Sequence, residues 1–156
     1  MKITIRSVKR TDGSDISRIL DQLGWFNQDE NVNENSCQTR IAGALDLFLS
    51  SPDHEAFVAE LGHGKLIGYM TVHWSPYFFL DGIEGLISEL FIDENHRGKG
   101  IGSQLINHVK KLANYRDCSR LMLINSRSRD SYQRQFYEKQ GFRERPEVAN
   151  FVYEFH

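Results

Sequence analysis

The fold of this chain is decided by the stretch Glu89-Leu90-Phe91-Ile92-Asp93-Glu94-Asn95-His96-Arg97-Gly98-Lys99-Gly100-Ile101-Gly102-Ser103. It begins within an almost continuously apolar run, Leu86 to Ile92, that is typical of a central strand covered on both faces. It ends where an amphipathic helix begins. A strand, a glycine-rich turn and a helix N-terminus form an anion site, because unpaired amides converge there and the helix dipole adds about half a positive charge.

The side chains of this turn favour the same interpretation. Arg97 and Lys99 add positive charge. Gly98, Gly100 and Gly102 would let the backbone take positive φ values and approach a ligand closely. A dinucleotide site is disfavoured, because the third glycine of its fingerprint is absent and no acidic residue follows the next strand. A tight turn without a ligand stays open on these residues alone.

The residues before this stretch alternate between strand and helix spacing. Apolar residues recur every second position in the strands and every three or four positions in the helices. The predicted elements are a strand from Ile3 to Val8, a helix from Thr11–Asp15 to Gly24, a surface loop from Phe26 to Asn35, a helix from Cys37 to Phe48, and hairpin strands from Ala56 to Glu60 and from Leu66 to Val72.

The residues from Ile83 to the C-terminus continue this alternation, so we expect one α+β domain over residues 1–156, built on a mixed sheet. The predicted elements are a strand from Ile83 to Ile92, a helix from Ile101 to Ala113, a strand from Arg120 to Asn125, a helix from Asp130 to Gly141, and an edge strand from Val148 to Phe155.

Composition excludes several classes of protein. Apolar residues make up 40% of the chain and charged residues 26%, as in an ordinary globular domain. The net charge of -2 argues against a nucleic-acid partner, and no apolar run approaches the roughly 20 residues that span a membrane. Without the apolar core of a signal peptide, the chain is expected in the cytoplasm. Cys37 and Cys118 are expected to be reduced, and the histidine spacing predicts no metal.

Two motifs together resemble the GNAT superfamily of N-acetyltransferases. Arg97-x-x-Gly100-x-Gly102, after Glu89 to Asp93, resembles its pyrophosphate-binding motif. Phe136 to Phe142 resembles its later helix, which carries a frequent tyrosine and a Tyr-x-x-x-Gly-Phe ending. The predicted order of elements agrees over nearly the whole chain. The resemblance implies a three-layer fold with a central mixed, mostly antiparallel sheet of six to seven strands, flanked by about four helices.

The resemblance implies acetyl-CoA as co-substrate. The amides from Gly98 to Ser103 would hold its pyrophosphate, and the main chain of Leu90 to Ile92 would pair with its pantetheine arm. Arg127, Arg129 and Arg134 either meet the remaining phosphate or form a solvated helix face. The cofactor-binding residues expected are Leu90, Phe91, Ile92, Arg97, Gly98, Lys99, Gly100, Ile101, Gly102, Ser103, Asn125 and Arg134.

Acetyl transfer from a thioester to an amine needs a base, an oxyanion site and an acid. Tyr137 is the candidate acid for the departing thiolate; the alternative is that it only packs under its helix. Glu89 is the first candidate base, because a carboxylate within an apolar strand is costly unless it has a purpose. Glu84 or an ordered water chain is the alternative, and Ser88 could position a water. A main-chain amide of Leu90 to Ile92 could stabilise the oxyanion.

The acceptor is expected to be a primary amine of a small molecule or a peptide, and the last strand permits a homodimer. A non-catalytic acyl-CoA sensor and a transferase of longer acyl groups stay open. The acceptor pocket could be lined by aromatic and acidic residues, namely Trp25, Phe26, Trp74, Tyr77 and Phe78, with Asp29, Glu30, Asp81 and Glu84 attracting a cation.

Overall fold

The computed structural model describes residues 1–24 and 34–155. The chain divides into two compact units, Met1–Ile124 and Asn125–His156, and each is described here by itself. Within the described ranges, no helix is long and apolar enough to cross a membrane.

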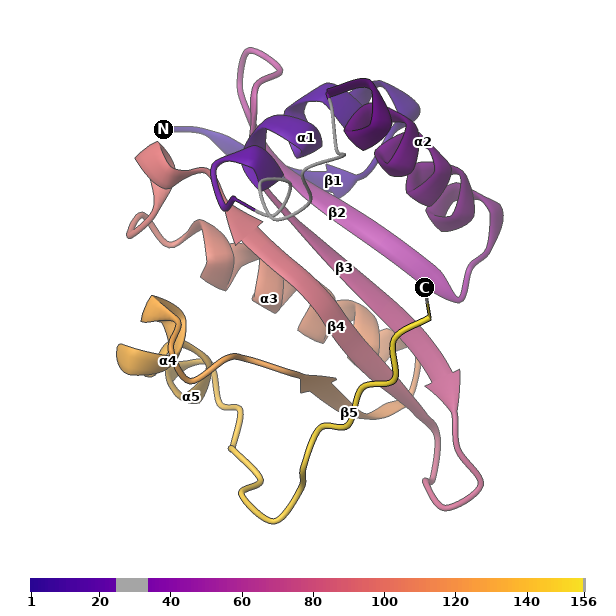
Figure 1. Cartoon of the computed structure of the whole chain (residues 1–156). Coiled ribbons are helices and arrows are strands. Elements are labelled where there is room, and N and C mark those ends of the chain that lie inside the picture. Colours follow the sequence, from indigo (N-terminus) through magenta and orange to yellow (C-terminus); the bar gives the residue numbers. More distant parts are fainter. Residues whose placement is uncertain (25–33, 156) are drawn as a thin grey trace. The chain divides into compact units, whose positions relative to one another are not determined.

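The first unit is built on one five-stranded sheet whose strands are neighbours in sequence order (Figure 1). The first four pair antiparallel, and the last pairs parallel to the fourth. A mixed, mostly antiparallel sheet is therefore confirmed, although the described residues form five strands rather than the six to seven expected. The strands are β1 (Ile3–Ser7), β2 (His54–Leu61), β3 (Leu66–Pro76), β4 (Ile83–Ile92) and β5 (Cys118–Leu123).

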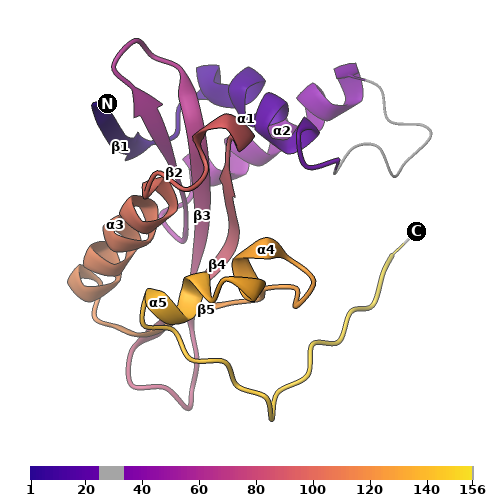
Figure 2. The same cartoon turned by 90° about the vertical axis from the view of Figure 1, so that its left-hand side faces the viewer.

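Helices cover both faces of this sheet (Figure 2). A short 3-10 turn, η1 (Arg10–Asp12), leads into α1 (Gly13–Asp21), and α2 (Glu34–Ser50) lies beside it on the same face. The helix α3 (Ile101–Tyr115) covers the opposite face. Because the connection from β4 to β5 passes through α3, these two strands can run parallel.

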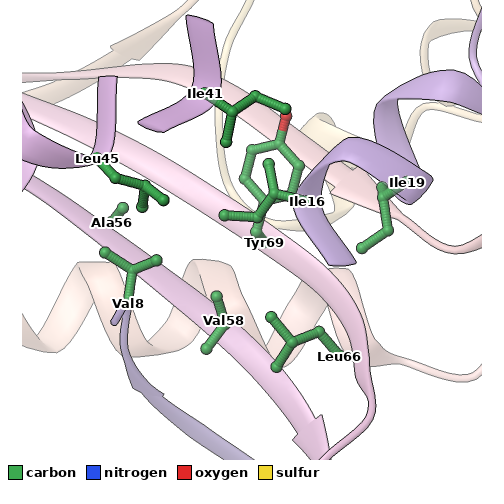
Figure 3. Close-up of a cluster of buried hydrophobic side chains, with 9 residues drawn as sticks. All are labelled: Val8, Ile16, Ile19, Ile41, Leu45, Ala56, Val58, Leu66 and Tyr69. Carbon is green, nitrogen blue, oxygen red and sulfur yellow. The ribbon is translucent and has the colours of Figure 1, made fainter. Parts of the chain in front are cut away.

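The core on the α1 and α2 side is aliphatic, with one tyrosine at its centre (Figure 3). Ile16 and Ile19 of α1 and Ile41 and Leu45 of α2 lie over strand residues that point to the same face. These apolar residues fall on one side of each helix, as the three- and four-residue spacing predicts. The strand residues of the cluster are Ala56, Val58, Leu66 and Tyr69, with Val8 after β1.

The second unit contains two short helices where the sequence predicts one. They are α4 (Asp130–Gln133) and α5 (Phe136–Lys139). Gln135, between them, takes the left-handed conformation with φ 55, which cannot continue a right-handed helix. Gly141 has φ 86, so the predicted end of this region at a glycine is correct.

The predicted strand from Val148 to Phe155 is wrong. The described segment forms no strand, and its apolar side chains are exposed, Phe151 and Phe155 at 91% each. Alternation of side chains predicts which residues would share a face of a strand. A strand also needs a hydrogen-bonding neighbour, which spacing does not supply.

Candidate active site

The strand β4 loses its neighbour on one side halfway along. It pairs with β5 only from Ile83 to Ile87, whereas it pairs with β3 as far as Ile92. At the same point the β3–β4 register shifts, so that Ser88 is an extra residue between Ile87 and Glu89. Such a bulge bends a strand and ends regular pairing. In the described part of the chain, residues 88–92 therefore present main-chain groups along an edge that no strand covers.

The glycine-rich turn follows this open edge, after the short helix η2 (Glu94–His96). Gly98 and Gly100 have φ values of 72 and 77, as predicted, and a Cβ at either position would meet nothing within 4 Å. Within residues 1–24 and 34–155, no hydrogen bond is found for the amides of Gly98, Gly100, Ile101 or Gly102. These donors at the start of α3 are free to bind an anion.

One predicted detail of this turn comes out differently. Gly102 does not have a positive φ, because it is the second residue of α3 and takes part in its first turn. The two cations bond back to the main chain: Arg97 Nε donates to the Ile92 carbonyl at 3.2 Å, and Lys99 Nζ to the Asn95 carbonyl at 2.9 Å. Both residues are exposed, so their charge strengthens the site without filling it.

Asp93, at the end of β4, connects this turn to α1 through hydrogen bonds of its side chain. Its side chain is 1% exposed and accepts hydrogen bonds from Arg18, from Gln22 at 3.1 Å and from the Asn95 amide at 3.0 Å. His96 Nδ1 lies 2.8 Å from the same carboxylate. Burial by itself would raise the pKa of Asp93, but these partners hold it well below its usual range. The carboxylate stays ionised and fixes where the strand ends.

A cavity of about 360 Å³ lies on the α1 and α2 side of the sheet. Among the described residues, its charged lining residues are Arg40 and Glu89, and the second half of β4 contributes Ser88 and Phe91 as well. Most of the wall is aliphatic. The described residues that line it are Val8, Ile16, Leu20, Arg40, Ile41, Ala44, Leu45, Phe48, Ala56, Val58, Tyr69, Thr71, Ser88, Glu89 and Phe91.

Glu89 and Tyr69 are the titratable pair of this cavity. Burial raises the pKa of Glu89, and the neighbouring Tyr69 hydroxyl opposes the shift. Burial, and after it the charge of Glu89, raises the pKa of Tyr69 far above its usual value. The Tyr69 hydroxyl is buried without a hydrogen bond of normal geometry. A carboxylate with a raised pKa beside a free hydroxyl can bind an ammonium group and take up a proton.

Glu84, the alternative base, does not line the cavity. It lies five residues earlier on the same strand, roughly 17 Å away at the usual rise per residue. Its side chain is 2% exposed and accepts a hydrogen bond from Arg120 of β5. The register of β4 against β5 places these residues opposite each other, so Glu84 stabilises the pairing of the two strands.

Three predicted aromatic pocket residues, Trp74, Tyr77 and Phe78, do not line the cavity. Trp74 is buried and donates from Nε1 to Glu55 at 2.7 Å. Tyr77 and Phe78 are exposed beyond the end of β3, and so is Asp81. The remaining predicted pocket residues, Trp25, Phe26, Asp29 and Glu30, lie outside the described residues.

The polar side chains of β3 on the cavity side, Tyr69 and Thr71, are not among the residues predicted from the sequence, and neither is the histidine that follows them, His73. They alternate along one strand, which is the signal for a shared face. The cross-strand register then pairs His73 with His54 and Thr71 with Glu89. That register could not be read from spacing within a single strand.

The second unit holds the other predicted residues, Tyr137, Asn125 and Arg134. Tyr137 is half-buried between the rings of Phe136 and Phe142, at centroid distances of 5.0 and 6.0 Å. Burial raises the pKa of its hydroxyl, although Arg129 and Arg134 oppose the shift. Within the described residues, that hydroxyl makes no hydrogen bond.

The polar residues around Tyr137 are partly engaged with one another. Asn125 accepts a hydrogen bond from Ser131 at 3.1 Å, and Arg134 Nε donates to Asp130 at 3.0 Å. Arg127 is paired with Glu144 at 2.7 Å. Arg134 and Arg127 are exposed, so their guanidinium groups can exchange these carboxylates for a phosphate.

Comparison with known proteins gives consistent results. The sequence model of the Acetyltransferase (GNAT) family matches residues 20–142. The chain is 27% identical over 140 residues to the thialysine N-epsilon-acetyltransferase of Bos taurus, covering 83% of this chain and 81% of that protein. Thialysine N-epsilon-acetyltransferase of Mus musculus is 26% identical over 125 residues, covering 76% and 72%.

Solved structures share the fold. A transcriptional regulator from Bacillus halodurans superimposes with a TM-score of 0.81 and 22% identity, covering 99% of this chain and 100% of that chain. Glucosamine-6-phosphate N-acetyltransferase from Arabidopsis thaliana gives a TM-score of 0.79 and 21% identity, with both chains covered completely.

Proposed function

The chain belongs to the GNAT family of acetyltransferases and is an N-acetyltransferase, and from that premise we propose that it transfers the acetyl group of acetyl-CoA to a primary amine by direct attack in a ternary complex. One observation carries the proposal. After Ile87, β4 is no longer paired with β5, and the open edge leads through η2 to the free amides of the glycine-rich turn. We further propose that both units act as one catalytic domain over residues 1–156.

The residues of the first unit fit the co-substrate. The amides of Gly98, Gly100, Ile101 and Gly102, which have no partner among the described residues, and the open space at Gly98 and Gly100 suit a diphosphate. Ser103, Arg97 and Lys99 lie beside them in the sequence. On the β5 side no strand of the described residues pairs with Leu90, Phe91 and Ile92, and this suits an extended arm that pairs like an added strand. Acetyl-CoA would supply an activated acetyl group and a thiolate leaving group. We assign Asn125 and Arg134 to the same binding role.

We assign the cavity to the acceptor amine and Glu89 to its ammonium group. Glu89 attracts the cation, and its raised pKa suits a group that must accept a proton from an amine. The rest of the wall is mostly aliphatic. A cavity of this kind favours an amine with an apolar body over a polycation, because additional charges would lie unpaired against apolar side chains.

Tyr137 is our candidate acid for the departing thiolate. Its hydroxyl is half-buried and makes no hydrogen bond to a described residue, which suits donation to a thiolate in a dry site. An enzyme that uses this acid loses turnover in Tyr137→Phe and keeps its affinity for acetyl-CoA. A non-catalytic acyl-CoA sensor would show no turnover to lose. The homodimer and the cytoplasmic location stay predictions.

Calorimetry with acetyl-CoA tests the assignment of the turn. Gly100→Asp should lower the affinity by at least tenfold, because it places a negative charge in the anion site and a side chain at φ 77. Gly64→Asp is the matched control: Gly64 has φ 89 and equally open space, but lies in the β2–β3 turn. Equal affinities of the two variants would contradict the assignment.

A panel of amines tests the acceptor class, with thiol release from acetyl-CoA as the measurement. We expect apolar alkyl and arylalkyl amines to give a higher kcat/KM than polyamines and aminoglycosides. The opposite ranking would overturn the assignment of the apolar cavity. Replacing acetyl-CoA with longer acyl-CoA donors in the same assay tests the alternative of a larger acyl group.

A further inference from the structure

A row of hydrogen-bonded side chains crosses three strands beside the cavity. Ser88 Oγ, at the bulge of β4, lies 2.7 Å from Thr71 Oγ1 and 2.7 Å from His73 Nε2, both of β3. His73 Nδ1 lies 3.0 Å from His54 Nδ1 of β2. Each group can both donate and accept a proton, so the row is continuous from β4 to β2.

The row joins two hollows of the molecule. Ser88 and Thr71 line the acceptor cavity, together with Glu89. His54 lines a second cavity of about 330 Å³, whose wall also includes Ser7, Ser50 and Ser51. Phe48 belongs to both walls, and its ring lies 5.6 Å from that of His73 and 6.4 Å from that of His54. Phe48 therefore packs beside both imidazoles where the walls of the two cavities meet.

His73 sets the direction of the row. Burial, and after it the neighbouring His54, lowers the pKa of His73, so this imidazole is neutral at neutral pH. A contact between two Nδ1 atoms requires one of them to carry hydrogen and the other to accept it. If His73 donates to His54, its Nε2 is the acceptor and receives the hydroxyl hydrogen of Ser88. The row then has one direction, from the acceptor cavity to the second cavity.

We propose that Ser88, His73 and His54 form the route by which the proton of the acceptor ammonium leaves the active site. This inference rests on the proposed function. It assigns the removal of the proton to the row instead of to Glu89, which is the candidate base of the proposed function, and leaves Glu89 to bind and orient the ammonium. His73 and His54 act through Ser88 and are positioning residues in this sense.

The proton transfers balance in one direction. An ammonium N–H bond breaks as a new O–H bond forms at Ser88, whose original proton passes to His73 Nε2. The Nδ1 proton of His73 passes to His54 Nδ1, and His54 releases its Nε2 proton to water in the second cavity. One proton has left the ammonium, and the amine nitrogen keeps the electron pair. Exchange with water restores the starting tautomers.

The row of hydrogen bonds could have a purely structural role, which is to hold the bulge in place, or it could conduct a proton. The variant His73→Gln distinguishes these two roles. Its amide can keep a hydrogen bond to Ser88 but cannot pass a proton from one nitrogen to another. The matched control is His108→Gln on α3. That ring is packed on Phe57 at 4.6 Å, and burial lowers its pKa too, but it lines neither cavity.

The experiment measures steady-state thiol release with a primary alkylamine, for the wild type, His73→Gln, His54→Gln and His108→Gln, between about pH 6.5 and 10. Near neutral pH we expect kcat of His73→Gln to fall by roughly 100-fold, with the acceptor KM changed less than about threefold. The loss should shrink toward pH 10, where the amine arrives deprotonated. Other polar and titratable groups that bear on this pH dependence, because they face His73 or line the acceptor cavity, are His54, Ser88, Glu89, Tyr69 and Arg40.

Chemical rescue provides the second readout. Imidazole added to His73→Ala should restore a substantial part of kcat, and should have no effect on His108→Ala. A loss that stays constant over the whole pH range, or an unchanged kcat in His73→Gln, overturns the proton route while the acetyltransferase assignment stands. A wild type that releases no thiol with any amine overturns the proposed function and the route together.

Discussion

The two halves of β4 differ in what surrounds them. Residues 83–87 lie between two strands, β3 on one side and β5 on the other. Residues 88–92 keep β3 but have no strand on the β5 side in the described part of the chain. The first half holds the sheet together. The second half presents main-chain groups and polar side chains to whatever binds there.

One glutamate on each half shows what this difference does. Glu84 is buried and paired with Arg120 of β5, whereas Glu89 lines a cavity beside the Tyr69 hydroxyl. Both are carboxylates inside an otherwise apolar strand. Their roles are separated by the loss of one neighbouring strand and by the bulge at Ser88. The pairing of the strand therefore decides which carboxylate is free for chemistry.

Residues 83–87 of β4, which lie between two strands, form the closed half of the strand. Removing an ion pair of this closed half should have the largest effect on stability. Arg120→Met removes the partner of a carboxylate that is 2% exposed, and should lower the free energy of unfolding by about 3 to 5 kcal/mol. Urea denaturation measures it. The control is Arg10→Met, whose ion pair with Asp46 is exposed (70% and 56%) and should contribute less than about 1 kcal/mol. Equal losses would mean that the closed half does not depend on this pair.

Residues 88–92 of β4, which have no strand on the β5 side in the described part of the chain, form the open half. A substitution in this open half should affect turnover instead of stability. Glu89→Gln should lower kcat/KM for the acceptor amine by roughly 100-fold, because the ammonium loses its carboxylate. Stability at neutral pH should stay the same or rise slightly. The raised pKa of Glu89 means that burial disfavours its ionised form, and glutamine removes that charge.

The pH dependence provides a further check on Glu89. Since its pKa is raised, the acid limb of the wild-type kcat/KM profile should lie above the usual range of a glutamate, and should be absent in Glu89→Gln. Glu94→Gln is the control, because this exposed carboxylate follows the open half but does not line the cavity. A Glu89→Gln variant with wild-type kinetics would remove the distinction between the two glutamates.

Much of the fold could be predicted from the sequence because it depends on local spacing. The predicted strand from Ile83 to Ile92 coincides with β4, and the predicted helix from Ile101 coincides with the start of α3. Prediction failed where the conformation of one residue, or a partner distant in sequence, decides whether a helix or strand forms. The left-handed conformation of Gln135 divides a helix whose apolar spacing is continuous. The strand predicted from Val148 onward has the right alternation and no neighbour.

The candidate site could be predicted only in part. Gly98 and Gly100 reveal themselves by residue type, and Glu89 by being charged in an apolar strand. The fate of Glu84 depends on how β5 is aligned with β4, and the row through Ser88 and His73 depends on the bulge. Registers between strands are set by packing of the whole sheet, so the sequence of one strand does not contain them.

The smallest expected effect concerns the point where the open half ends. Asp93→Asn weakens hydrogen bonds from Arg18, Gln22 and His96, and should lower the free energy of unfolding at pH 7 by about 2 kcal/mol. Because the pKa of Asp93 is depressed in the folded state, its contribution is present above the unfolded pKa, about 3.9, and is lost as pH falls toward the folded value. The stability difference between wild type and variant should therefore shrink below about pH 4. Denaturation at several pH values measures this, with the exposed Asp53→Asn as control; a difference that grows on acidification would contradict the assignment of Asp93 as the ionised anchor of the turn.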